Sequence, residues 1–484
     1  MFHFTQHRRL TITVLIIAPS LLLLLLITTH IIPFTSKGGL LIFATPTIPN
    51  VDRPPLQLSS DPYTTSNSQH QTELEPGTYS FGSTIVTAFQ VGRFIDTASS
   101  NIGWATSLDS GATWKNGFLP GTTQFAGGLY TRVSDPSVAY DAVHKTWIIS
   151  SVAVIGNGST LASPAIIVNL STDGGLTWSK PLDVVNGGST YYDKDWIVCD
   201  NTSTSAFYGH CYVEWDNDNK GGLILMSTST DGGYTWGVAQ TTLDKAHGLG
   251  GQPLVQPNGT VIVPISGYAT SRMLSFTSTN GGSSWNSTVV AAKITGSVLP
   301  TAEIDATGKV YLVWVDCQFE KSCNAKGGGE DAALYNGSHG EDDLVMSTST
   351  DGINWSPVQL IPIDPLGSGL DHVVPGLGVD KHTSGKTAHL ALTYYYHATN
   401  CDRNCEYYAG FVTSIDGGVH WTQKIQLAGP MPVSWLSQGR NKVGDYISTS
   451  FCNGLAFPVF SIATAPESGH LKEEIYTITG GMIA

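Results

Sequence analysis

Four acidic residues precede strand-like segments at similar places along the chain: Glu75, Asp135, Asp195 and Asp445. If the segments that follow them lie side by side, their carboxylates come close together and repel one another. Such repulsion raises the pKa of one carboxyl group unless a cation intervenes, which suits general acid and base chemistry or metal binding. The alternative is that the four acids cap turns or form ion pairs with nearby bases.

Basic and aromatic residues next to these acids could take part in the same chemistry. Bases lie a few residues before three of them: Arg132, Lys194 and Arg440. Tyr446 directly follows Asp445, and His372 stands before another strand-like segment. A histidine in such a place more commonly forms a structural hydrogen bond, so its role in substrate binding is one of two interpretations. No spacing of ligand residues predicts a metal site, and no cofactor is expected.

The elements that position these residues are indicated by a short string that recurs six times. Its copies are SLDSGATW at 107–114, STDGGLTW at 171–178, STDGGYTW at 229–236, STNGGSSW at 278–285, STDGINW at 349–355 and SIDGGVHW at 414–421. The aspartate can accept hydrogen bonds from backbone N–H groups further on, while glycine permits a positive φ. Because each string follows an apolar run, it predicts a tight hairpin between antiparallel strands, with a structural rather than a catalytic role.

A weaker repeat lies upstream of the hairpin strings and gives the number of units. Seven units begin at Glu75-Pro76, Asp135-Pro136, Asp195-Trp196, Gln252-Pro253, Leu299-Pro300, Val374-Pro375 and Asp445-Tyr446. Three or four strands in a unit of about 60 residues predict an all-β fold, a seven-bladed β-propeller. Six blades are the alternative, if the last unit merges with the first. The last unit lacks a hairpin string, and its outer strand could come from the segment before Glu75.

The chain before the repeats is expected to reach a membrane. Residues 1–9 are basic, residues 10–32 are almost wholly apolar, and residues 33–73 form a Pro/Ser/Thr-rich linker to the propeller domain at 74–484. The apolar run is longer than the roughly 7–15 residues of a removable signal, so we expect an uncleaved signal anchor, a transmembrane helix. The positive-inside rule places the rest of the chain on the extracytoplasmic side. The alternative is a cleaved signal and a secreted protein.

Cysteine spacing and net charge limit the compartment and the partners. Three close pairs could form disulfides in an oxidising compartment, and Cys452 is left over: Cys199 with Cys211, Cys317 with Cys323 and Cys401 with Cys405. Buried, reduced thiols are the alternative. Seven N-x-S/T sequons could carry glycans. The net charge of −14 has the wrong sign for a nucleic-acid partner.

The six strings resemble the bacterial neuraminidase repeat, or Asp-box, family of sialidase-like propellers, whose signature is S-x-D-x-G-x-T-W. The resemblance extends from about residue 73 to the C-terminus and is specific for the fold, but the box also occurs in propellers that only bind. It implies that the boxes lie on the face away from the active site. Sialidases of this kind bind the substrate carboxylate with three arginines, and use an aspartate as acid/base and a tyrosine nucleophile activated by a glutamate.

This chain departs from that pattern at the arginines and at the expected blade number. It has no R-I-P tripeptide, and the segment ending at Arg93 has Gln90 where the family commonly has glutamate. The resemblance usually implies six blades rather than seven. Arg93, Arg132 and Arg440 are the arginines that we expect to bind substrate.

The sequence leads to three hypotheses about function. The first is an extracytoplasmic, sialidase-like exo-glycosidase that acts on glycans, with catalytic residues among Glu75, Asp135, Asp195, Asp445 and Tyr446, and with Asp135 or Asp195 as general acid. The second is a non-catalytic propeller that binds a glycan or a protein at the cell surface. The third is a purely structural assembly module.

Overall fold

The computed structural model describes residues 53–484 apart from short gaps at 66, 269, 296–298, 322, 324–340, 400, 402–403 and 439–442. The predicted basic end at 1–9, the signal anchor at 10–32 and most of the linker lie outside the described residues. Among the residues that are described, no helix is long and apolar enough to cross a membrane.

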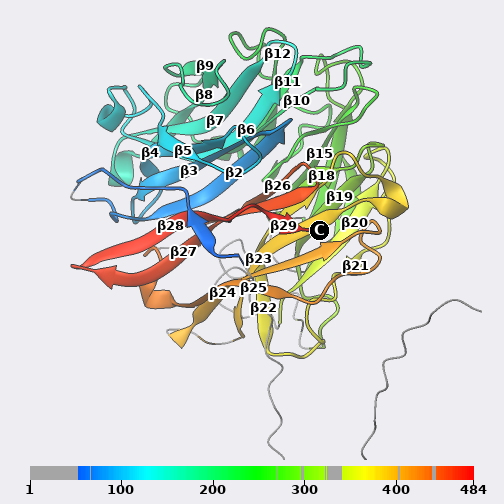
Figure 1. Cartoon of the computed structure of the whole chain (residues 1–484). Helices are drawn as coiled ribbons and strands as arrows, with labels where there is room; N and C mark the ends of the chain where they lie inside the picture. The colour runs from blue at the N-terminus through cyan, green and yellow to red at the C-terminus, as the bar shows by residue number, and fades with distance from the viewer. Residues whose placement is uncertain are drawn as a thin grey trace, which may run out of the picture. The chain divides into compact units, whose positions relative to one another are not determined.

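The described chain is all-β, and its sheets are antiparallel (Figure 1). The largest sheet contains β2 (Glu73–Phe81), β3 (Thr84–Arg93), β4 (Ser99–Ser107), β5 (Lys115–Phe118), β6 (Arg132–Asp141), β7 (Thr146–Ile155), β8 (Ala162–Ser171) and β9 (Leu182–Asn186). It consists of two four-strand groups, which are joined only where Ser99 of β4 pairs with Val133 of β6.

Four further sheets follow in chain order. The next two contain β10 (Tyr192–Cys199), β11 (Cys211–Asn217) and β12 (Leu223–Ser229), and then β13 (Gly248–Leu249), β14 (Leu254–Val255), β15 (Val261–Gly267), β16 (Arg272–Ser278) and β17 (Val289–Lys293). The two after them contain β18 (Thr301–Ile304), β19 (Val310–Asp316), β20 (Asp343–Ser349) and β21 (Gln359–Leu360), and then β22 (Leu370–Val379), β23 (Leu390–Ala398), β24 (Glu406–Ser414) and β25 (Ile425–Pro432).

The last sheet joins the two ends of the described chain. It contains β26 (Ser448–Cys452), β27 (Leu455–Glu467), β28 (His470–Ile478), β29 (Met482–Ile483) and β1 (Pro55–Gln57). Strand β1 pairs antiparallel with β28, so that Leu56 lies opposite Thr477. The prediction that the outer strand of the last unit comes from the segment before Glu75 is confirmed by this pairing.

The first strands of the units contact one another in chain order, from β2 through β6, β10, β14, β18 and β22 to β26. Strand β26 in turn contacts β2, so the contacts between first strands form a closed circuit. In Figure 1 the red C-terminal strands accordingly lie beside the blue β2.

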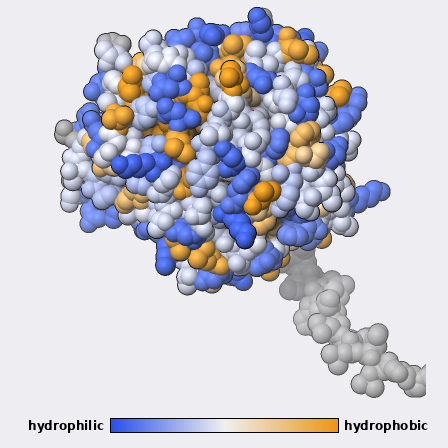
Figure 2. All heavy atoms as spheres, turned by 90° about the horizontal axis from the view of Figure 1, so that it is seen from above, coloured by the Kyte–Doolittle hydropathy of each residue, from blue (hydrophilic) through white to orange (hydrophobic). Residues whose placement is uncertain are grey.

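The strands form because their apolar residues are buried on both faces of the sheets. All seven residues of β19 are buried, and Trp314 within it is fully buried. Continuous apolar runs of this kind are typical of strands covered on both sides. On the face shown in Figure 2, by contrast, hydrophobic residues form several separate patches among polar ones.

The six Asp-box strings form the predicted hairpins, and their polar groups are satisfied locally. In the second box Asp173 accepts hydrogen bonds from the backbone N–H groups of Leu176 and Thr177, and from the Thr177 hydroxyl at 2.6 Å. The Trp178 indole donates to the carbonyl of Gly175. The carbonyl of Gly175 also accepts a hydrogen bond from Thr106 of the preceding unit. This box therefore links the two four-strand groups of the largest sheet, as expected of structural residues.

Three disulfides connect the cysteine pairs that the sequence predicts: Cys199 with Cys211, Cys317 with Cys323 and Cys401 with Cys405. Cys452 is free and buried. Cys199 and Cys211 lie directly opposite each other in β10 and β11.

Candidate functional site

Four of the first strands carry a β-bulge at the same position, and the bulge sets the direction of one side chain. The residues with positive φ at these bulges are Glu75, Asp135, Lys194 and Val374. A bulge re-aims a side chain and interrupts the ladder, and such bulges are common next to functional sites. Positive φ in a residue other than glycine costs free energy, so the surrounding packing must hold these conformations.

The third bulge corrects the sequence alignment of the units by one residue. The sequence repeat places Asp195 at the position of Asp135, whereas the bulges place Lys194 there and put Asp195 in line with Pro136. The equivalent position therefore holds an acid in the first two units, a base in the third and an apolar valine, Val374, in the sixth. The acids of the first two units thus face a lysine.

Lys194 lies at the centre of the resulting cluster. Its Nζ is 3.0 Å from Oδ2 of Asp445 and 4.0 Å from Oδ1 of Asp135. The same ammonium group lies over the ring of Tyr446, 4.6 Å from its centre. Burial alone would lower the pKa of Lys194, but Asp445, Asp135 and Glu75 raise it above its usual value. The lysine therefore stays charged and holds the carboxylates together.

Glu75 is bound on the other side of the cluster through Gln90. Gln90 donates hydrogen bonds to Glu75 and, at 3.1 Å, to Ser134, and its own carbonyl accepts one from Arg93 at 2.7 Å. The backbone N–H of Asp445 donates to Glu75 at 3.3 Å. The structure thus brings together Glu75, Asp135 and Asp445, which are far apart in the sequence.

Burial raises the pKa values of the carboxyl groups in and beside the cluster. Burial raises the pKa of Asp135 to about 6, although the nearby Lys194 opposes the rise. Burial also raises the pKa of Asp193 to about 6, and that of Glu75 above its ordinary value. The pKa of Asp195 is raised well above its usual range, chiefly by burial. An acid with a pKa near 6 can both give and accept a proton close to neutral pH.

Glu214 belongs to this region and was missed by the sequence analysis. It lies opposite Trp196 in β11 and is completely buried, and neither of its carboxylate oxygens has a hydrogen-bond partner. Burial and the neighbouring Asp195 raise its pKa well above the usual value. The available signal was a glutamate inside the otherwise apolar run FYGHCYVEW.

Two aromatic rings border a small pocket beside the cluster. The rings of Trp196 and Tyr446 are 5.5 Å apart and nearly perpendicular. The pocket has a volume of about 20 Å³, and Lys194 and Asp195 also line it. The Tyr446 hydroxyl donates a hydrogen bond to the carbonyl of Pro136 at 3.2 Å, and burial raises its pKa well above the usual value. This tyrosine is therefore protonated in the structure.

The arginines that were expected to bind substrate make internal contacts. Arg93 is directed to Gln90 and Glu75. Arg132 forms an ion pair with Asp96 and stacks on Phe94, with its guanidinium carbon 4.1 Å from the ring centre. Arg440 lies outside the described residues.

His372 is placed in a different group of side chains, at the start of β22. Its Nε2 is 3.1 Å from Asp364 and its Nδ1 is 3.7 Å from Asp343. The ring also contacts Tyr394 edge-on at 5.6 Å. None of these contacts involves the cluster around Lys194.

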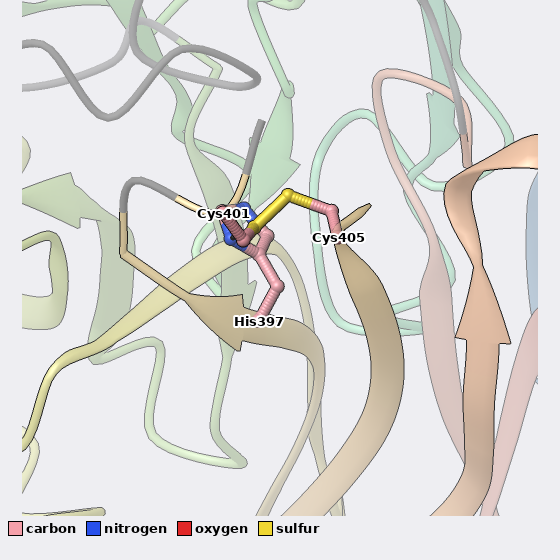
Figure 3. A group of neighbouring side chains, drawn as sticks. All are labelled: His397, Cys401 and Cys405. Carbon is pink, nitrogen blue, oxygen red and sulfur yellow. Dashed lines mark hydrogen bonds between the residues drawn. A yellow bond between two sulfur atoms is a disulfide. The ribbon is translucent and has the colours of Figure 1, made fainter. Parts of the chain in front are cut away.

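One group in the described ranges has three residues of kinds that bind metals close together: His397, Cys401 and Cys405 (Figure 3). The two sulfur atoms are joined in a disulfide, and Nδ1 of His397 is 3.7 Å from the sulfur of Cys401. A metal is bound by thiolates rather than by a disulfide. In this oxidised form the disulfide closes a short loop in the segment between β23 and β24.

A larger hollow lies at the other ends of the first strands. It has a volume of about 470 Å³, and its lining includes Tyr79, Phe81, Asn201, Glu303, Lys381 and Phe451. Phe81 is six residues beyond Glu75 on β2, which corresponds to roughly 20 Å of extended chain. The Ser83 carbonyl after β2 accepts a hydrogen bond from Ser110 of the first Asp-box, so this hollow and that box lie at the same end.

The middle of the chain matches a known family. Residues 165–379 match the model of the BNR repeat-like domain. The resemblance that the Asp-box strings predict is thereby confirmed. No curated protein sequence matches the chain.

Solved structures that align with this chain include a sialidase, an arabinofuranosidase and an ulvan lyase. A Hadza microbial sialidase aligns at 14% identity and a TM-score of 0.44, covering 85% of this chain and 66% of the sialidase. An α-L-arabinofuranosidase of Fusarium graminearum aligns at 14% identity and a TM-score of 0.47, covering 88% and 96%. An ulvan lyase aligns at 12% identity and a TM-score of 0.49, covering 88% and 96%. Because every TM-score is below 0.5, no activity is assigned to this chain from these alignments.

Proposed function

We propose that the sheets are the blades of a seven-bladed β-propeller. The support is the closed circuit of contacts from β2 through β26 and back to β2, together with the division of the largest sheet at Ser99 and Val133. In this arrangement β1 completes the last blade, which joins the two ends of the described chain. Such closure protects sheet edges.

We propose that the protein is a glycan-processing enzyme, a sialidase-like exo-glycosidase that hydrolyses glycosidic bonds at the Lys194 cluster. One observation carries the proposal: Asp135, with a pKa of about 6, lies 4.0 Å from Lys194 beside further carboxylates. Most glycosidases use two carboxyl groups, one protonated to assist the leaving group and one ionised, whereas sialidases have a tyrosine nucleophile; Asp135 and Asp445 correspond to the first pattern. The BNR repeat-like match agrees with such a function but does not assign it.

In this mechanism Asp135 is the general acid and Asp445 is the ionised partner. Because burial raises its pKa to about 6, Asp135 is protonated in a substantial fraction of molecules only near or below pH 6, and that form can transfer a proton to the oxygen of the leaving group. Asp445 is kept close by the ion pair with Lys194.

The test compares Asp135→Asn, Asp445→Asn and the surface control Asp183→Asn on sialosides and neutral glycosides. General acid assistance is worth about 10²–10⁴-fold, so we expect Asp135→Asn to lose that much kcat on alkyl glycosides. The loss should be much smaller on nitrophenyl glycosides, whose leaving group needs no proton. Equal losses on both substrates, unchanged rates in both site variants, or an inactive wild type would contradict the proposal.

The second candidate function is a propeller that binds glycans or a protein without catalysis. It is favoured by Arg93 and Arg132, whose described partners are internal, and by the 470 Å³ hollow at the opposite end. Binding on a glycan array by the wild type, with no hydrolysis of any bound glycan, would support this function instead.

We also propose that the chain is anchored in a membrane through residues 10–32 and faces the extracytoplasmic side. The support is the length of the apolar run and the two arginines before it, Arg8 and Arg9. Membrane fractionation followed by protease treatment of intact cells tests this. A protein found entirely in the medium would support cleavage and secretion.

A further inference from the structure

Asp342, just before β20, is a buried carboxylate with nothing to satisfy it. The residue is 1% exposed, and neither of its carboxylate oxygens has a hydrogen-bond partner. Nearby Asp316 shows the ordinary arrangement: it accepts hydrogen bonds from the backbone of Thr295 and Gln318 and from the indole of Trp314. Two such acids near each other, one fully bonded and one not, indicate that the second has a partner of another kind.

Asp371 of β22 is an acidic neighbour of Asp342 from the next sheet. One oxygen of Asp371 accepts hydrogen bonds from the Asp342 backbone N–H at 3.1 Å and from Thr399 at 3.0 Å. Its other oxygen has no hydrogen bond and is also buried. This oxygen lies 3.8 Å from Nδ1 of His397.

The charged groups packed around Asp342 leave its own charge unbalanced. Asp371, Asp316 and Asp343 all interact unfavourably with it. The cationic groups of the surrounding strands face other acids: His372 faces Asp343 and Asp364, Lys424 faces Asp364, and His397 faces Asp371. In the described part of the chain, no ion pair reaches Asp342.

A buried, unpaired carboxylate is too costly to remain as it is. Moving an ionised carboxylate into the interior costs several kcal/mol even after relaxation. Without a cation the group must take up a proton, and burial together with the three neighbouring acids raises the pKa of Asp342 to about 8. The remaining solution is a bound cation, which also removes the repulsion between Asp342 and Asp371.

We propose that Asp342 and Asp371 bind a divalent cation, Ca²⁺, between the sheet of β18–β21 and the sheet of β22–β25. The open atoms that they offer are carboxylate oxygens, which hard cations prefer. Ca²⁺ tolerates irregular geometry and completes its six to eight ligands with carbonyl groups and water. The site is separate from the Lys194 cluster and stands whether or not the protein is a glycosidase.

The test uses the full chain after treatment with EDTA, at pH 7.5, with CaCl₂ added stepwise. A ligand that binds only the folded state, and whose free concentration is about 100 times its Kd, should raise the Tm of a domain of this size by roughly 3 °C. Calorimetric titration should show one more Ca²⁺ bound by the wild type than by the Asp342→Asn variant. MgCl₂ should give a weaker response because Mg²⁺ demands stricter geometry.

Two variants show whether the response belongs to these residues. Asp342→Asn should lose the rise with CaCl₂. Its Tm in EDTA at pH 7.5 should not fall below that of the wild type, because a carboxyl group with a pKa of about 8 is largely protonated there and asparagine is uncharged as well. Asp371→Asn should also lose the rise, while Asp183→Asn, which changes an exposed carboxylate, should keep it. The proposal is overturned if CaCl₂ leaves the wild-type Tm unchanged, or if Asp342→Asn responds as the wild type does.

Discussion

Replacement of Lys194 by methionine tests whether this lysine holds the acidic cluster together. Methionine keeps much of the length and apolar volume of the side chain but removes the charge that lies 3.0 Å from Asp445 and 4.0 Å from Asp135. Removing one partner of a buried ion pair costs about 3–5 kcal/mol, because the other charge remains buried without compensation. For the roughly 430 residues of the β-domain, the unfolding entropy is about 0.9 kcal/mol/K, so the Tm should fall by about 3–6 °C.

The pH dependence of this loss gives a second, independent check. In the wild type, Asp135 and Asp193 have pKa values of about 6 in the folded state, above the unfolded value of about 3.9. The folded state therefore binds more protons between about pH 4 and 6, and the stability that these acids contribute is lost as the pH rises through 6. Without Lys194 their pKa values rise further, so the difference between Lys194→Met and the wild type should shrink from pH 7.5 to pH 5.

Guanidinium denaturation followed by tryptophan fluorescence measures both effects. The matched control is Lys309→Met, because Lys309 also lies over an aromatic ring, that of Tyr311 at 4.6 Å, but is only half-buried. The control should lose less than about 1 kcal/mol. A Lys194→Met protein as stable as the wild type at pH 7.5, or a difference that grows toward acid pH, would refute the argument.

Two further predictions concern the hairpins. Asp173→Ala removes the acceptor of four hydrogen bonds and should cost about 1–2 kcal/mol, whereas Asp183→Ala should cost little. Equal denaturation midpoints for the two variants would contradict the structural role of the box. Trp285→Ala should cost about 3–5 kcal/mol, because Trp285 is fully buried against Tyr212 and Phe276. Trp236 is only partly buried, so Trp236→Ala should cost clearly less. The reverse order would show that burial does not set these costs.

The hairpin aspartates and the cluster acids should differ in how their contributions to stability change with pH. Burial alone would raise the pKa of Asp173, but hydrogen bonds from Thr177 and its neighbours lower it to about 2. Its stabilising contribution is therefore present above the unfolded pKa of about 3.9 and is lost as the pH falls toward 2. The cluster acids, whose pKa values are raised, have the opposite dependence in a higher pH range.

Local features of this protein were determined by the sequence alone. The Asp-box hairpins, such as that of Asp173, depend on hydrogen bonds between residues two to four positions apart, and they were predicted correctly. The disulfide Cys199–Cys211 also joins residues that are close along the chain. The all-β class followed from the strand-like runs before the hairpin strings and from the lack of any stretch after residue 33 that keeps a 3.6-residue period for three turns.

The tertiary structure decided which charged groups meet. A bulge shifted the third unit by one residue, so that Lys194 rather than Asp195 faces Asp135 and Asp445. Glu214 and Asp342 looked ordinary in the sequence, yet both are buried without a hydrogen-bond partner. A shift of one residue turns a side chain to the other face of a sheet. Burial and pairing between distant strands therefore depend on contacts that no local pattern records.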